Sequence, residues 1–212
     1  MTLPTSGLIT VNDRGARAAT TFGSVAAGGG NMVFIKKLTA SSSGTLSFVD
    51  GASSVVLDST YKEYLFTFNN IHPGTNNVNF TFNMSVDSGS NYNVTKTTAG
   101  FEVFHVEDDS DAGLQYLTDS DLAQATGFQR LTRESGADAD QSISGSLHLF
   151  NPSSTTFVKH FISRISNSQS SDVALSYGFA GYGNTTSAVD AMQFKMSSGN
   201  IDAGDICLYG IL

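Results

Sequence analysis

The chain has 212 residues and a formal net charge of −8, from 11 Lys and Arg against 19 Asp and Glu. This acidic balance argues against a nucleic-acid partner, because phosphate binding needs clustered basic side chains. No apolar run approaches the roughly 20 residues of a membrane-spanning helix, and the abundance of Gly, Ser, Thr and Asn favours strands and tight turns over helices.

Residues 1–31 are predicted to form an extended N-terminal arm that ends in a Gly-rich hinge at 28–30. A flexible tail is the simpler interpretation. The alternative is an arm that orders on a neighbouring subunit, because it carries apolar residues and its two arginines oppose an acidic body. The candidate assembly residues are Leu3, Leu8, Ile9, Val11, Arg14 and Arg17.

A β-sheet body is predicted over residues 32–212. Its early strands are expected at 33–38, 45–49 and 55–57, where apolar residues alternate with polar ones.

The stretch 61–86 is the strongest β pattern in the chain. Apolar residues fall on every second position over 64–68 and again over 78–86. Successive side chains of a strand point to opposite faces, so each set makes one apolar face. Pro, Gly and Asn at 73–77 favour a loop between the two sets. We therefore expect two long strands that pair through this loop. Four aromatic residues are predicted in the core: Phe66, Phe68, Phe80 and Phe82.

A turn at 87–91 is followed by two further predicted strands, at 92–98 and 101–106. The segment 107–140 is the least regular part of the body, and it contains acidic stretches at both ends. Within it we expect one short helical turn over 119–125 and a strand over 128–133. Such a loop-rich insertion is either a binding region or passive surface.

Strand patterns resume after this insertion. The predicted strands are 143–149, 157–165, 173–182, 191–196 and 206–212. Segment 157–165 is apolar at both alternate sets of positions, which is typical of a strand covered on both faces. The total of about ten strands with turns between them predicts an all-β fold, a single antiparallel β-sandwich or jelly-roll-like body.

No motif of phosphate binding, serine hydrolysis or zinc proteolysis is present, so we expect no enzyme, no metal and no cofactor. His148 and His160 flank one predicted turn without further zinc ligands. The acidic stretches lack calcium-loop spacing, and no two carboxylates are placed as glycosidase chemistry needs. Cys207, the only cysteine, is predicted to be buried and inert. Four tyrosines could stack on sugars if exposed: Tyr92, Tyr116, Tyr177 and Tyr182.

Several segments resemble virion structural proteins of tailed bacteriophages, especially marine ones. The opening MTLPTSGLITVND is similar to the LP-x-SG-x-I-x-x-x-D start of phage tail-associated proteins. Similarity to their body is carried by LTASSSGTLSFVDG, LDSTYKEYLFTFNNIHP and VDSGSNYNVT, and similarity to their second half by HLFNPSSTTFVKHFISR and SAVDAMQFKMSSGNIDAGDICLYGIL. These segments together span nearly the whole chain.

The resemblance implies a non-enzymatic virion component, made in the host cytoplasm and anchored to the particle through its arm. Capsid decoration and a tail or fibre role both fit. Other virion proteins are the implied partners, and a homo-oligomer is expected, with a trimer favoured. The alternatives are a carbohydrate-binding receptor module that meets a host surface glycan, and a depolymerase. The N-terminus lacks the basic and apolar regions of a signal peptide, so export by that route is not expected.

Overall fold

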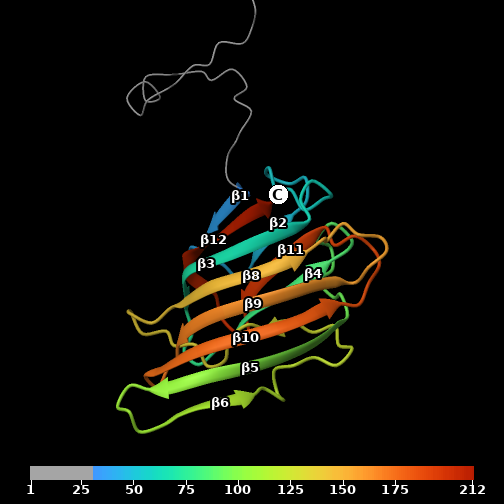
Figure 1. Cartoon of the computed structure of the whole chain (residues 1–212). Helices are drawn as coiled ribbons and strands as arrows, with labels where there is room; N and C mark the ends of the chain where they lie inside the picture. Colours follow the sequence, from blue (N-terminus) through green and yellow to red (C-terminus); the bar gives the residue numbers. More distant parts are fainter. Residues whose placement is uncertain (1–30) are drawn as a thin grey trace, which may run out of the picture. The chain divides into compact units, whose positions relative to one another are not determined.

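The computed structural model describes residues 31–212, which form one compact unit of two antiparallel β-sheets (Figure 1). Within these residues there are twelve strands and no helix. The predicted all-β sandwich is confirmed, whereas the finer likeness to a jelly roll stays a prediction.

The large sheet has eight strands in the order β1-β12-β3-β8-β9-β10-β5-β6, and the small sheet has four in the order β2-β11-β4-β7. The strands of the large sheet are β1 (Met32–Thr39), β12 (Ile201–Ile211), β3 (Glu63–Pro73), β8 (Ile143–Phe150), β9 (Lys159–Ser168), β10 (Val173–Gly183), β5 (Lys96–Val106) and β6 (Ala112–Tyr116). The strands of the small sheet are β2 (Leu46–Val49), β11 (Ala191–Met196), β4 (Phe80–Ser85) and β7 (Gln129–Arg130).

Phenylalanines from both sheets meet in the core between them. Phe194 of β11 lies at the centre, with its ring centroid 5.3 Å from those of both Phe66 and Phe68 on β3. Phe82 of β4 contacts Phe161 of β9 across the same gap, at 4.9 Å. Edge-to-face and offset pairs at such distances add stabilisation beyond the area that they bury. All four predicted core residues are buried: Phe66, Phe68, Phe80 and Phe82.

The predicted pairing of 64–68 with 78–86 is wrong. β3 lies in the large sheet between β12 and β8, while β4 lies in the small sheet between β11 and β7. Phe68 and Phe80 therefore face each other across the sandwich, 5.2 Å apart, instead of lying side by side in one sheet. The loop between the strands carries the chain from one sheet to the other, so both apolar faces point into the same core.

Several other boundaries differ from the expectation. Residues 55–57 form no strand, although Val55 and Leu57 are buried. The two strands expected over 92–106 are one strand, β5, which begins only at Lys96. No helical turn forms over 119–125, and the strand expected over 128–133 is reduced to β7. β6 was not expected at all.

The irregular segment 117–135 covers part of the inner face of the large sheet. Leu117 and Leu131 of this segment are buried. Backbone hydrogen bonds join the segment to β5: the Leu117 N–H donates to the Gly100 carbonyl at 2.9 Å, and the Thr98 N–H donates to the Leu122 carbonyl at 2.9 Å. This segment is thus neither passive padding nor an open loop, because it completes the cover that the four-stranded sheet is too narrow to provide.

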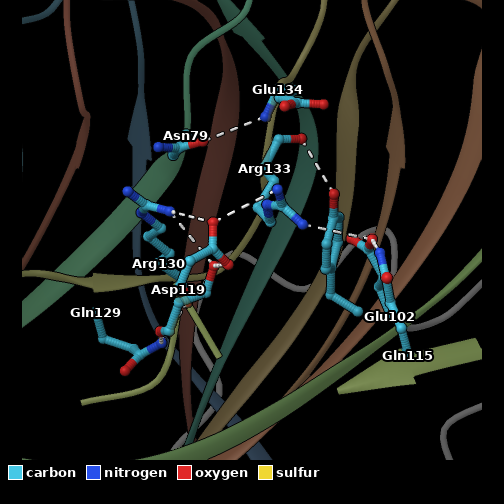
Figure 2. A network of polar contacts seen from close by, with 10 residues as sticks. Asn79, Glu102, Gln115, Asp119, Gln129, Arg130, Arg133 and Glu134 are labelled. Carbon is cyan, nitrogen blue, oxygen red and sulfur yellow. Dashed lines mark hydrogen bonds and ion pairs between the residues drawn. The ribbon is translucent and has the colours of Figure 1, made fainter. Parts of the chain in front are cut away.

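A polar network fastens this segment to β5 and β10 (Figure 2). The Arg133 guanidinium lies 3.6 Å from the buried Glu102 carboxylate of β5 and 3.4 Å from Asp119. The Tyr177 hydroxyl of β10 donates to the Arg133 carbonyl at 3.1 Å. Burial raises the pKa of Tyr177, so this hydroxyl stays protonated as a donor. A charge as deeply placed as that of Glu102 needs such a partner, because an unpaired buried charge is costly.

Candidate interaction surface

Large apolar side chains cluster on the outer face of the large sheet, at its β6 end. The front of Figure 1 shows this face, which no other element of the described chain covers. We call the cluster the apolar surface; its five members are Phe101 and Val103 of β5, Leu114 and Tyr116 of β6, and Ile162 of β9. Their exposed fractions run from 40% for Phe101 to 71% for Leu114.

The register of the strands brings these residues together. Phe101 pairs with Tyr116 and Val103 with Leu114 in the β5–β6 ladder, so the four side chains stand as two adjacent rows. On the other side, Phe101 is opposite Gly178 of β10. A Cβ atom at Gly178 would lie only 2.6 Å from the Phe101 ring, so glycine there lets the ring lie flat on the sheet. The apolar surface is therefore fixed by the sheet itself.

A shallow hollow of about 320 Å³ lies within the apolar surface, bordered by Phe101, Tyr116, Ile162, Ala180 and Arg164. The Arg164 guanidinium carbon lies 5.7 Å from the centroid of the Phe101 ring, within the range of a cation–π contact. Arg164 thus supplies a positive charge at the edge of an otherwise apolar hollow.

The outward positions of β5, β6, β9 and β10 carry no carboxylate, although the chain has 19 acidic residues. One carboxylate contacts the apolar surface from a neighbouring loop: Asp121 accepts a hydrogen bond from the Tyr116 hydroxyl at 2.7 Å. This hydrogen bond raises the pKa of Tyr116. A face that combines exposed aromatic rings with a low density of negative charge has the character of a protein-binding surface.

The four histidines are dispersed and each has a neighbour of its own. His148 Nδ1 lies 2.5 Å from the Glu63 carboxylate, and His105 Nε2 lies 3.0 Å from Asp109. His160 packs edge-on against Tyr182, not against His148. No group of three or more His, Cys, Asp or Glu side chains that could hold a metal ion occurs in residues 31–212.

The predicted sugar-stacking tyrosines are not equivalent. Tyr177 is fully buried in the polar network, so the prediction that its ring could stack on a sugar is wrong. Tyr92 and Tyr182 are half-buried, and only Tyr116 is well exposed. The Cys207 thiol is buried, as predicted.

Glu63 and Glu102, two carboxylates of the large sheet, lie on opposite faces of it. Glu63 lies on the outer face of the large sheet beside His148, whereas Glu102 lies on the inner face beside Arg133. Glu134, in contrast, lines the same shallow pocket as Glu102, together with Arg133.

The predicted assembly residues of the arm, from Leu3 to Arg17, lie outside the described residues. Sequence reasoning missed the apolar surface, although a signal was present: β5 has apolar side chains at both alternate sets of positions, with Phe101 and Val103 in one set and Phe104 in the other. The same pattern over 157–165 predicts a strand covered on both faces, and this prediction is wrong, because Ile162 of β9 is 50% exposed.

Comparison with known proteins gives no match to a family model, to a curated protein or to a solved structure. Among residues 31–212, no helix is long and apolar enough to cross a membrane.

Proposed function

We propose that this chain is a non-enzymatic structural protein that joins protein subunits through the apolar surface of its large sheet. The observation that carries the proposal is the cluster of exposed Phe, Tyr, Leu, Ile and Val side chains on strands β5, β6 and β9, whose outward positions carry no carboxylate. Burying such side chains against a partner is favourable by about 25 cal/mol per Å² of apolar surface. An isolated subunit that keeps them in water forgoes this stabilisation.

The setting that we propose is the virion of a tailed bacteriophage, where the chain decorates the capsid or belongs to the tail or fibre. The ground for this setting is the resemblance of the segments quoted above, and a sandwich with exposed apolar side chains on one face suits a subunit that contacts its neighbours. The hollow beside Arg164 would suit a glycan less well, because its border is mainly apolar and sugars need several hydrogen-bonding groups as well as a ring to stack on.

A surface variant tests the joining function. Replacing Leu114 by Glu places a charge in the middle of the apolar surface, and we expect binding to partner subunits to weaken at least tenfold, which corresponds to about 1.4 kcal/mol. The matched control is Phe157→Glu, because Phe157 is 69% exposed in a loop away from this surface.

Binding is measured as self-association of the full chain by sedimentation velocity and as recovery of the chain on purified phage particles. The proposal is overturned if Leu114→Glu and Phe157→Glu behave alike in both measurements. Binding to glycans on an array that is lost in the Tyr116→Ala variant would instead favour the receptor module. Release of reducing ends from a polysaccharide would favour a depolymerase.

A further inference from the structure

At one edge of the large sheet, β6 is a regular strand without charged side chains. β6 pairs only with β5, so the backbone groups on its other side have no strand partner. Its sequence, AGLQY, contains no charge and no proline, and its ladder with β5 has no register shift. Regular, uncharged edges of this kind are templates for pairing with another strand.

The opposite edge of the same sheet shows the contrast. β1 carries Lys36 and Lys37, and its ladder with β12 is interrupted by a bulge between Phe34 and Lys36. Lysines and bulges are the usual devices that prevent unwanted pairing at a sheet edge. One edge is thus blocked while the other is left available.

Charges beside β6 restrict what can pair with it. Four carboxylates precede the strand, at Glu107, Asp108, Asp109 and Asp111, and Asp121 follows it. If two copies of β6 paired antiparallel, the acidic end of each would meet the other's Asp121 end, and like charges would repel. The edge therefore favours a short apolar strand that carries basic residues at one end.

We propose that residues 8–11 from the N-terminal arm of a second copy bind along β6, antiparallel to it. This inference rests on the proposed function and names a partner for the sheet edge that borders the apolar surface. Residues 8–11 read Leu-Ile-Thr-Val, a β-prone run about as long as β6, and Arg14 and Arg17 follow. Antiparallel pairing with β6 directs these arginines toward the acidic loop at 107–111.

Charge complementarity supports this choice at the level of the whole chain. The first 30 residues hold two arginines and one aspartate, which gives them a net charge of +1. Because the whole chain has a net charge of −8, residues 31–212 have a net charge of −9. Donation of an arm by each copy to the next is a head-to-tail contact, and such contacts close into rings when the rotation between copies permits. A trimer is one such ring.

Photo-crosslinking of the full chain tests the contact. A benzoylphenylalanine is placed at Leu114, which tolerates it because 71% of the side chain is exposed, and, as the control, at Phe34 on the blocked edge, which is 57% exposed. Equal amounts of ¹⁴N- and ¹⁵N-labelled chains are mixed before irradiation, and the crosslinked tryptic peptides are identified by mass spectrometry.

The expected product joins position 114 to the N-terminal tryptic peptide in mixed-isotope form, at least tenfold more than position 34 does; this peptide is residues 1–14, or residues 1–36 where Arg14 and Arg17 are replaced. Replacing both Arg14 and Arg17 by Glu should reduce this product at least fivefold, and replacing Asp109 and Asp111 by Lys in the same chain should restore it. Products of a single isotope show that each arm binds its own body, and a 114-to-114 product shows that two β6 strands pair. Either result overturns the inference, as does the lack of any arm product. If position 114 crosslinks instead to other body residues of a second copy, the inference fails while the proposed function stands.

Discussion

Phe194 is the residue on which the core is centred, because its ring contacts five other phenylalanines from both sheets. Its partners are Phe48, Phe66, Phe68, Phe80 and Phe82, with centroids between 5.3 and 6.4 Å away. We expect Phe194→Ala to lower the free energy of unfolding by about 3–5 kcal/mol, since the neighbours cannot fill the cavity. Chemical denaturation measures this loss. The exposed Phe157 provides the control: Phe157→Ala should change stability by less than about 0.5 kcal/mol.

Lys96 is an unusual buried cation, and it gives stability a pH dependence. Its Nζ donates to the Asn83 side-chain oxygen at 2.5 Å and to the Val94 carbonyl at 2.7 Å, with no carboxylate among these partners. Burial lowers the pKa of Lys96 from 10.5 to about 8. The unfolded chain therefore binds a proton that the folded chain releases between about pH 8 and 10.5, and folding gains stability as pH rises through this window.

The variant Lys96→Met isolates this effect. Between pH 8 and 9.5, the free energy of unfolding of the natural chain should rise by about 1–2 kcal/mol relative to that of the variant. Tyr64 and Tyr177, whose pKa values burial raises, are present in both chains, so their contributions cancel in the difference. A stability difference that stays constant over this range would show that Lys96 is not held neutral by burial.

At the scale of elements, the ladder between β3 and β12 contains an irregularity that depends on Gly204. Its φ is +108°, and a Cβ atom there would lie 2.7 Å from the Ile71 Cα. The pairing of the two strands shifts register between Ala203 and Asp205. We expect Gly204→Ala to cost about 2 kcal/mol or more, because the substitution adds both strain and a clash with backbone. Gly127→Ala is the control, since no atom lies within 4 Å of the added Cβ. Thermal unfolding compares the two, and equal midpoints would contradict the role of Gly204.

Sequence periodicity predicted which residues face the core but not which strands are neighbours. The alternation over 191–196 puts Met192, Phe194 and Met196 on one face of the strand, and all three are buried. Alternation says nothing about partners, however, so β3 and β4 were placed in one sheet because a short loop joins them. That loop in fact crosses between the sheets, and this depends on contacts with β8, β11 and β12 that lie far away in sequence.

The candidate surface could be predicted only in part, for a related reason. Apolar residues on both faces of a strand indicate either burial on both sides or an adhesive face, and the sequence of β5 fits both. Sequence periodicity did not predict β6, because the strand is short, lies between acidic residues and has its apolar side chains exposed. The order of strands in the sheets decides between burial on both sides and an exposed apolar face, because it leaves the outer face of β5, β6 and β9 uncovered.

At the scale of the whole molecule, the arm and the body are expected to have separate roles. Deleting residues 1–31 should change the melting temperature of the isolated body by less than about 2 °C, because the described core is complete without them and only a larger loss of stability would shift the transition further. The same deletion should abolish oligomers and incorporation into particles. Calorimetry and sedimentation velocity test the two parts separately. Normal assembly of the shortened chain, or its unfolding, would contradict the assigned role of the arm.

The two ends of the described chain lie side by side, which has a mechanical consequence. β1 and β12 pair antiparallel with Met32 opposite Ile211, and the Leu212 amide bonds to the Asn31 carbonyl at 2.8 Å (Figure 1). A pulling force applied between residues 31 and 212 would load the hydrogen bonds of this ladder one after another, beginning at the pair Met32 and Ile211. It would therefore detach β1 at low force. A force applied to β1 along its own direction, with β12 held fixed, would instead shear this ladder and load its hydrogen bonds together. The described part of the chain is therefore expected to resist a pull between its two ends less than a pull that shears β1 along β12.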